Sequence, residues 1–191
     1  MLPCYNEGLN IVPLTEKWFD LKDRFAAAGY ELFVTCIDDK STDDTAAKIM
    51  ELTERFDNCF FVQHERNKGL GGGLNTAFSL FLEKGEDGDL CVLMDGDNSH
   101  DPVYSLSMLP KIEEGYDVVI ASRYCTDSAV KGVSGIRLML SDGAGLFYRL
   151  ILGVKMSGIT HAVTGCTPMR SSPKPGPFTE KTWLRGIPLP V

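Results

Sequence analysis

The sequence has 191 residues, of which 43% are hydrophobic, and this is enough for one α/β domain with a core of its own. The formal net charge of −7, from 26 acidic and 19 basic residues, argues against a nucleic-acid-binding protein, whose surface carries clustered basic side chains. The same charge opposes a diphosphate ligand, which would need local cations, helix N-termini or a metal ion.

The first third of the sequence predicts helices and strands in alternation. Residues 1–3 leave almost no room for a first strand, and an apolar stripe then predicts a helix over residues 11–25, with Gly29 as its stop. Residues 32–37 predict a buried strand and 59–62 another strand. Between them we expect a second helix that carries Ile49, Leu52 and Phe56. The stripe of the first helix consists of Ile11, Leu14, Trp18, Leu21 and Phe25.

The same alternation continues to residue 121. A glycine-rich turn over 69–73 leads into a helix that carries Leu74, Phe78 and Phe81, and 90–94 predict a third strand. A short helix follows Pro102, and 118–121 predict a further strand. Because the strands are near-continuous apolar runs between helices, we expect a mostly parallel sheet with helices on both faces.

Domain organisation changes near the end of the sequence. Periodicity fades beyond Gly153, and six of the ten prolines lie from Pro168 onward. We expect an ordered domain over residues 1–167 and a Pro-rich, irregular or disordered tail over 168–191.

The six cysteines form no C-x-x-C pair, and several lie in expected strands. We therefore expect reduced, buried thiols in a cytoplasmic protein. No signal-peptide pattern opens the sequence, and no apolar run approaches the roughly 20 residues that span a bilayer. The cysteines are Cys4, Cys36, Cys59, Cys91, Cys125 and Cys166.

The most informative motif is the acidic segment 95–101, directly after the third predicted strand. Asp95 and Asp97 stand one residue apart, a spacing that suits a hard cation with oxygen ligands, and Gly96 lets a ligand approach the backbone. The alternative is that these are ordinary solvated loop carboxylates. An EF-hand is excluded, because His100 and Leu106 occupy the positions that need Gly and Glu.

Three other segments lie at predicted strand ends or between elements. A carboxylate of Asp38 or Asp39 can accept hydrogen bonds from a base or ribose, while Ser41, Thr42 and Asp43 can cap the next helix. The glycine-rich segment fits neither a dinucleotide fingerprint nor a P-loop, so a tight turn is the better interpretation. Arg123 can pair with phosphate, or it can be a surface ion-pair partner.

In order along the chain, these segments resemble the family-2 glycosyltransferases of GT-A fold, and within them the polyprenyl-phosphate (dolichol-phosphate) mannosyl- and glucosyltransferases. The resemblance covers residues 3 to about 153. It includes P-x-Y-N-E (3–7), D-D-x-S-x-D-x-T (38–45), N-x-G-L-G (67–71), the D-x-D segment and S-R-Y (122–124).

The resemblance implies a site and a reaction. An enzyme of this kind transfers a hexose, with inversion, from a UDP- or GDP-linked sugar to a polyprenyl phosphate, with Mg²⁺ or Mn²⁺ as cofactor. Arg123 would bind phosphate or stabilise negative charge during transfer. The nucleoside would contact Pro3, Tyr5, Glu7, Ile37 and Asp39; the sugar diphosphate would contact Asp95, Gly96 and Asp97; the metal ligands would be Asp95, Asp97 and, less closely implied, Ser99.

The sequence also departs from this branch. Where the branch has T-S-G-F-R or T-G-S-F-R, the chain has His161 to Pro168, with Thr167 or Pro168 in place of the Arg. We therefore expect a truncated or partial chain, and a non-catalytic nucleotide-sugar-binding domain is the alternative function. A D-x-D-x-T phosphatase or a sugar nucleotidyltransferase is a third class that the remaining motifs do not support.

The segment 136–152 interleaves Leu, Ile and Phe with arginines. It is either a helix that lies on a membrane surface or an ordinary amphipathic core helix. The expected location is the cytoplasm, peripheral to the cytoplasmic face of a membrane, with a role in cell-envelope or glycan biosynthesis.

Overall fold

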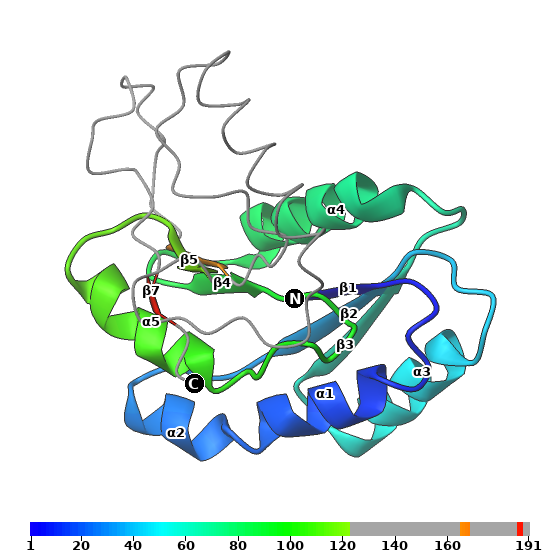
Figure 1. Ribbon diagram of the computed structural model, residues 1–191, viewed down its shortest axis with the longest axis horizontal. Coiled ribbons are helices and arrows are strands. Elements are labelled where there is room, and N and C mark those ends of the chain that lie inside the picture. Colours follow the sequence, from blue (N-terminus) through cyan, green and yellow to red (C-terminus); the bar gives the residue numbers. More distant parts are fainter. Residues whose placement is uncertain (123–164, 169–186, 189–191) are drawn as a thin grey trace, which may run out of the picture.

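The computed structural model describes residues 1–122, 165–168 and 187–188 (Figure 1). The predictions for Arg123 and for the amphipathic segment 136–152 lie outside the described residues. The described helices are α1 (Ile11–Phe19), α2 (Lys22–Ala27), α3 (Thr45–Arg55), α4 (Gly69–Lys84) and α5 (Tyr104–Glu113). The described strands are β1 (Leu2–Cys4), β2 (Val34–Asp38), β3 (Cys59–Gln63), β4 (Leu90–Leu93), β5 (Val119–Ser122), β6 (Gly165–Pro168) and β7 (Ile187–Pro188).

The strands form two sheets that meet at β1 and β4. One sheet has the order β1-β2-β3 with parallel pairs, and the other has the order β4-β6-β5-β7. The Met94 amide donates to the Met1 carbonyl (3.2 Å) and the Gly96 amide to the Pro3 carbonyl (3.2 Å). Because both chains advance by two residues between these bonds, they run in the same direction. Among the described strands, β6 is antiparallel to β4 and β5, whereas the pairs β1–β2, β2–β3 and β5–β7 are parallel. The expected mostly parallel sheet is therefore confirmed.

The first strand is short but central. The sequence left almost no room for it, yet Leu2–Cys4 form β1 between β2 and the residues that follow β4. Leu2 is fully buried and Cys4 nearly so, because alternate side chains of a strand point to the same face. Pro3 contributes its carbonyl to the ladder, and its missing N–H removes nothing from that bond.

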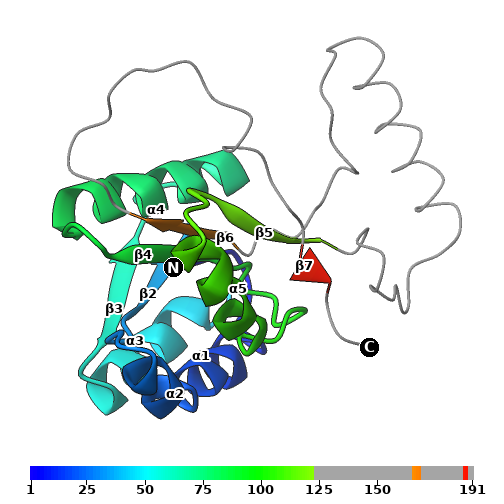
Figure 2. The ribbon, with the colours of Figure 1, turned by 90° about the vertical axis from the view of Figure 1, so that its left-hand side faces the viewer.

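Helices cover both faces of the sheet, as expected from the alternation of elements. Helices α1, α2 and α3 lie on one face and α4 lies on the other (Figures 1 and 2). Helix α5 packs against β5 and β6, and its Leu109 joins the core cluster on the α1 side. The boundary expected at residue 167 falls within β6, and β7 lies in the segment expected to be the tail.

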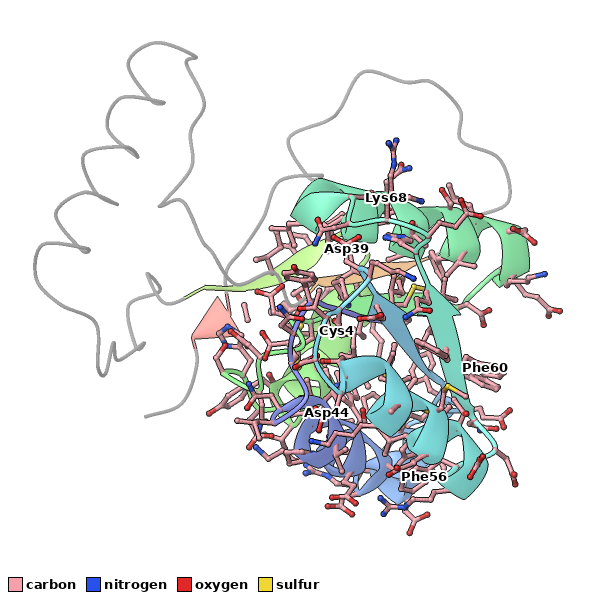
Figure 3. The ribbon with its side chains drawn as sticks, turned by 90° about the vertical axis from the view of Figure 1, so that its right-hand side faces the viewer. Cys4, Asp39, Asp44, Phe56, Phe60 and Lys68 are labelled. Carbon is pink, nitrogen blue, oxygen red and sulfur yellow. The ribbon has the colours of Figure 1, made fainter. Side chains whose placement is uncertain are left out.

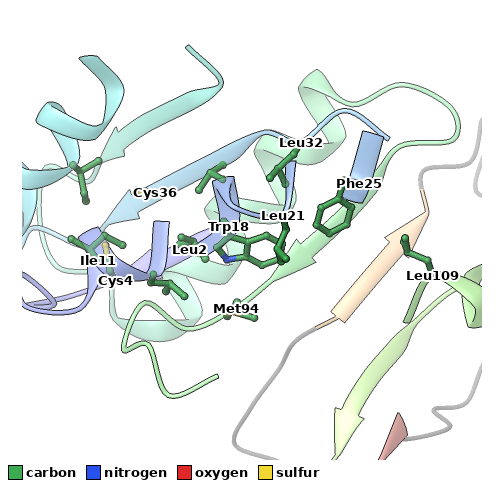
Figure 4. Packing of buried hydrophobic residues seen from close by; sticks show 13 residues of the cluster. Leu2, Cys4, Ile11, Trp18, Leu21, Phe25, Leu32, Cys36, Met94 and Leu109 are labelled. Atoms are coloured by element: carbon green, nitrogen blue, oxygen red, sulfur yellow. The ribbon is translucent and has the colours of Figure 1, made fainter. Parts of the chain in front are cut away.

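The apolar stripe over residues 11–25 is buried as predicted, but it belongs to two helices. Helix α1 ends at Phe19, and the Leu21 amide bonds the Trp18 carbonyl (3.0 Å), which tightens the turn before α2. This turn keeps Leu21 and Phe25 on the same side as Trp18 (Figure 4). The prediction of one continuous helix was therefore wrong, although its buried face was right.

The glycine-rich segment is helical and not a tight turn, which corrects the prediction. Helix α4 begins at Gly69, whose φ of +70° suits glycine, and the following glycines lie in its first turns. Glycine is also needed at 73, because a Cβ there would lie 3.1 Å from the Pro3 Cβ. The helix can start here because Asp39 accepts its first backbone N–H groups, as described below.

The cysteines in the described core are reduced and buried, as predicted for the first four of them. Burial, with the nearby charge of Asp38, raises the pKa of the Cys4 thiol to about 12, so this thiol stays protonated at neutral pH. Cys125 and the Cys166 side chain lie outside the described part. The free, buried cysteines are Cys4, Cys36, Cys59 and Cys91.

Within residues 1–122, 165–168 and 187–188, no helix combines the length and the apolar character that a bilayer span requires.

Candidate functional site

The loops that follow β1, β2, β3 and β4 meet at one edge of the sheet, where parallel α/β folds bind ligands. The Asp39 amide bonds the Cys4 carbonyl (2.9 Å), and the His64 amide bonds the Asp38 carbonyl (2.9 Å). These bonds hold the ends of β1, β2 and β3 together. Figure 3 shows Asp39 between the end of β1 at Cys4 and the start of α4 at Lys68.

The loop after β1 is fastened to the loop after β2 by reciprocal hydrogen bonds. The Asn6 amide donates to Ser41 Oγ (2.8 Å), and the Thr42 amide donates to Asn6 Oδ1 (2.8 Å). Asn6 has a φ of +57°, which Asn tolerates better than most residues. The Glu7 amide donates to Thr45 Oγ1 (2.9 Å). This network fixes the backbone on which Tyr5 and Glu7 stand.

Of the three capping candidates, Asp43 accepts an amide of α3, although the N-cap position itself is Asp44, which makes no side-chain capping bond. Asp43 Oδ1 accepts the Thr45 amide (3.0 Å) at the start of α3, and its Oδ2 accepts the Gly8 amide (3.1 Å). The hydroxyl of Thr45, followed by these amides, lowers the pKa of Asp43. The carboxylate therefore stabilises both α3 and the loop after β1.

Asp39 lies at the site edge and is largely buried, with 6% of its surface exposed. Its Oδ1 accepts the Lys68 amide (2.7 Å) and lies 2.6 Å from His64 Nδ1, and its Oδ2 accepts the Gly69 amide (2.7 Å). Burial raises the pKa of Asp39, but the His64 and backbone hydrogen bonds outweigh burial and lower the pKa overall. The carboxylate is therefore ionised and anchors the N-terminus of α4.

The neighbours of Asp39 support it from the core. Asp38 is fully buried and accepts hydrogen bonds from the Ser41 amide (3.2 Å) and Gln63 Nε2 (2.8 Å). Ile37 is also fully buried and packs with Ala77 and other apolar side chains under α4. The structure thus places Ile37 in the core, from which it sets the position of the next two residues.

The acidic loop begins directly after β4 and is fitted closely to β1. A Cβ on Gly96 would lie 2.7 Å from the Cys4 Cβ and 3.2 Å from the Pro3 carbonyl oxygen. Glycine was expected here for the approach of a ligand, whereas the structure requires it for the approach of β1. Because of this contact, the D-x-D loop and the loop after β1 occupy one site.

The carboxylates of the acidic loop concentrate negative charge. Asp97 is exposed and accepts the Ser99 amide at Oδ1 (2.9 Å), while Asp95 is half-buried. Burial first, and then the charges of Asp97 and Glu7, raise the pKa of Asp95, and His100 opposes them. A site that raises a carboxyl pKa through neighbouring negative charge favours a bound cation.

The donor set fits Mg²⁺ or Mn²⁺ held jointly with a ligand. Within the described residues there is no group of three or more His, Cys, Asp or Glu side chains that would enclose a metal ion. Asp95 and Asp97 supply hard oxygen ligands from one side, and Mg²⁺ is commonly bound by one or two carboxylates together with phosphate oxygens and water. The Ser99 side chain is exposed on the same loop.

The loop is also held from outside the site. Asn98 has a φ of +55°, and its Oδ1 accepts a hydrogen bond from Lys17 Nζ of α1 (2.9 Å). This contact fixes the turn between Asp97 and Ser99.

The remaining predicted contacts lie in β1 and on the loop after it. Pro3 is half-buried, Tyr5 is 46% exposed, and Glu7 is half-buried with its Oε2 accepting Asn10 Nδ2 (2.7 Å). The structure brings this loop together with Asp39 and the D-x-D loop, while Arg123 lies outside the described residues.

Two residues of the site edge were missed by sequence reasoning, His64 and Thr76. His64 lies two residues after the predicted strand 59–62, at the edge where Asp39 also lies, and its position was the available signal. Thr76 carried no signal, because it is one polar residue of a helix. Only folding brings it 2.8 Å from His64 Nε2.

Comparison with known proteins finds similarity to glycosyltransferases. Residues 1–173 match the profile of glycosyl transferase family 2. The polyprenol monophosphomannose synthase of Mycolicibacterium smegmatis is 32% identical over 161 residues, which are 84% of this chain and 57% of that protein. The dolichol-phosphate mannosyltransferase of Pyrococcus furiosus is 29% identical over 170 residues, which are 89% of this chain and 45% of that protein.

Among solved structures, the mannosyl-3-phosphoglycerate synthase of Rubrobacter xylanophilus superposes with a TM-score of 0.62 at 18% identity, covering 87% of this chain and 51% of that one. This similarity shows a shared fold. The chain spans about half the length of the curated relatives it matches.

Proposed function

The chain belongs to glycosyl transferase family 2 and has the GT-A fold that its sequence resembles, and we propose that it binds a nucleoside diphosphate sugar and transfers the sugar to a polyprenyl phosphate. One observation carries the proposal. Gly96 seats the D-x-D loop against β1, so that Asp95 and Asp97 share one sheet edge with the loop of Tyr5 and Glu7 and with Asp39.

The nucleoside binds between the loops after β1 and β2 in this proposal. Tyr5 offers an exposed ring for contact with a base, and Glu7 and Asp39 offer acceptor oxygens for base N–H or ribose O–H groups. Pro3 and Ile37 fix the backbone on either side. Both UDP- and GDP-linked sugars carry such base N–H and ribose O–H groups, so the site suits either nucleotide.

The diphosphate binds toward the acidic loop, at Asp95, Gly96 and Asp97, with Ser99 beside them. The protein as a whole is acidic, with a net charge of −7, so a diphosphate needs compensating charge at this loop. Asp95 and Asp97 would hold Mg²⁺ or Mn²⁺, which would supply that charge and stabilise the departing nucleoside diphosphate. Arg123 is proposed as the cation that contacts phosphate.

The proposed acceptor is supported by two relatives, a polyprenol monophosphomannose synthase and a dolichol-phosphate mannosyltransferase. A phosphate oxygen of the lipid attacks the anomeric carbon, the bond from that carbon to the diphosphate oxygen breaks, and the configuration inverts. Because the acceptor is already anionic, the reaction requires no general base. With a lipid acceptor the protein would work at a membrane surface, for which we propose the cytoplasmic face.

The proposal is tested by calorimetric titration of UDP- and GDP-sugars, with and without Mn²⁺, into the wild type and Asp97→Asn. We expect metal-dependent binding of one donor class and a loss of at least tenfold in affinity for the variant, because one ligand of the cation loses its charge. The matched control is Asp57→Asn, the same change at an exposed turn before β3, which we expect to bind like the wild type.

A product assay with polyprenyl phosphate then separates the two functions that the sequence allows. Formation of the glycosyl lipid supports transfer, whereas donor binding without product supports a non-catalytic nucleotide-sugar-binding domain. If no nucleotide sugar bound to the folded wild type with or without Mn²⁺, the proposal would be wrong for this chain.

A further inference from the structure

Three side chains from three elements form a hydrogen-bonded chain behind the site. His64, after β3, lies with Nδ1 2.6 Å from Asp39 Oδ1 and with Nε2 2.8 Å from Thr76 Oγ1 of α4. His64 is 5% exposed and Asp39 6% exposed, so only a small part of either side chain faces solvent. Hydrogen bonds in such surroundings orient their members strongly, because a buried polar group without a partner is costly.

The direction of these hydrogen bonds follows from the state of Asp39. The carboxylate is ionised and can only accept, so His64 Nδ1 carries a proton and donates it to Oδ1. In the neutral ring Nε2 is then an acceptor, and it receives the hydroxyl proton of Thr76. Asp39 thus fixes a proton on Nδ1, and the Thr76 hydroxyl, which can donate or accept, adapts to Nε2.

The same carboxylate keeps part of its acceptor capacity for a ligand. Among the described residues, His64 and the Lys68 amide approach Oδ1, and the Gly69 amide alone approaches Oδ2. A carboxylate has about four acceptor sites, so Oδ2 retains one that these donors do not use. Rotation of the carboxylate would break several of these bonds at once.

We propose that His64 is a positioning residue that, backed by Thr76, holds the Asp39 carboxylate in the orientation in which Oδ2 receives a donor group of the nucleoside. This inference rests on the proposed function, because it presupposes that Asp39 faces the nucleoside. The two backbone amides alone fix the carboxylate from the side of α4, and His64 fixes it from the side of β3. His64 itself touches no part of the substrate.

Two conservative variants separate the two ends of the imidazole. The amide nitrogen of Asn is as many bonds from Cα as Nδ1, so His64→Asn keeps a donor toward Asp39 and loses the contact with Thr76. The amide nitrogen of Gln corresponds to Nε2, so His64→Gln reaches toward Thr76 and leaves Asp39 without this donor. Both variants have the same uncharged amide group, and each is the control of the other.

The experiment measures the affinity of UDP, GDP and inorganic pyrophosphate, each with Mn²⁺, for the wild type and both variants. For whichever nucleotide binds, we expect His64→Gln to lower the affinity about tenfold, because a hydrogen bond to a charged group contributes at least that much. His64→Asn, which keeps this hydrogen bond, should lower the affinity no more than about threefold. Pyrophosphate, which lacks a nucleoside, should bind all three proteins equally. Thermal unfolding of each protein confirms that it is folded.

Equal nucleotide affinity of His64→Gln and wild type would overturn the inference, as would equal losses in both variants or a parallel loss for pyrophosphate. If the wild type bound pyrophosphate but neither nucleotide, the proposed nucleotide site would fail instead. Imidazole ¹⁵N spectra test the chain without any ligand. There are three histidines in the sequence, and the His64 signals, identified by their loss in His64→Gln, should show a proton on Nδ1. The opposite tautomer would refute the arrangement.

Discussion

Gly96 is the residue at which the acidic loop meets the first strand. It lies between the two carboxylates proposed to bind the metal, and its amide bonds the Pro3 carbonyl (3.2 Å). A Cβ at this position would lie only 2.7 Å from the Cys4 Cβ, so the close approach of Cys4 requires glycine. The position of Asp95 and Asp97 relative to the loop after β1 therefore depends on a contact made by backbone atoms.

At this position we predict that Gly96→Ala lowers the free energy of unfolding by about 1–3 kcal/mol, because the new methyl group overpacks the contact with β1. The matched control is Gly71→Ala in α4, where a Cβ meets nothing within 4 Å. The control should gain up to about 1 kcal/mol, as alanine does over glycine in a helix. Urea unfolding measures both, and a Gly96→Ala protein as stable as the wild type would show that the loop is not seated against β1.

At the scale of elements, Asp39 connects the end of β2 to β3 and α4. Its carboxylate contacts His64 after β3 and accepts hydrogen bonds from the first amides of α4. The glycine-rich start of α4 has weak helix propensity of its own. The positively charged end of the helix also favours an anion at this point. The helix thus begins where the carboxylate is, and the site edge and α4 are stabilised together.

We predict that Asp39→Asn lowers the free energy of unfolding at pH 7 by about 1–3 kcal/mol, because an amide replaces charged hydrogen bonds and directs its own NH₂ toward donors. The folded-state pKa of Asp39 is below its usual value of 3.8, so the Asp39 carboxylate binds a proton less tightly in the folded state than in the unfolded chain. Its contribution is therefore complete above the unfolded pKa and is lost as the pH falls through the folded pKa.

Urea unfolding from pH 7 to pH 3 measures this dependence. The difference between wild type and Asp39→Asn should narrow below about pH 4, whereas Asp57→Asn at an exposed turn should differ little at any pH. A difference that stayed constant down to pH 3 would contradict the role of the charge.

At the scale of the molecule, one hydrophobic cluster joins the two sheets. It contains Leu2 of β1, Leu14 of α1, Val34 of β2 and Leu109 of α5, together with Met94 after β4 (Figure 4). Because residues from both sheets share this cluster, we expect the described part to unfold as one cooperative unit.

Leu14, which is fully buried in this cluster, and Leu9, which is 87% exposed, offer a matched comparison. We predict that Leu14→Ala lowers the free energy of unfolding by about 2–5 kcal/mol, through lost burial and the cavity that remains. Leu9→Ala should change it by less than about 0.5 kcal/mol. Tryptophan fluorescence and circular dichroism should report the same midpoint for each protein, and separate midpoints would indicate that the sheets unfold independently.

The sequence by itself determined the features that depend on neighbours along the chain. Apolar periodicity identified the helices and most strands, with the buried stripe of Ile11 to Phe25 correct even where one helix became two. The acidic residues could be assigned to strand ends because each group directly follows a buried apolar run in the sequence. Since parallel strands end at a common edge, the location of the site followed as well.

The tertiary structure decided what depends on residues far apart in the chain. The three residues of β1 are a strand because β2 and the chain after β4 flank them, and the glycine-rich segment is a helix because Asp39 accepts its first amides. Likewise, His64 lies 25 residues from Asp39, and Gly96 is matched to Cys4 across the sheet. The physical reason is that hydrogen-bond partners and close contacts are fixed by the pairing of strands, which local periodicity does not specify.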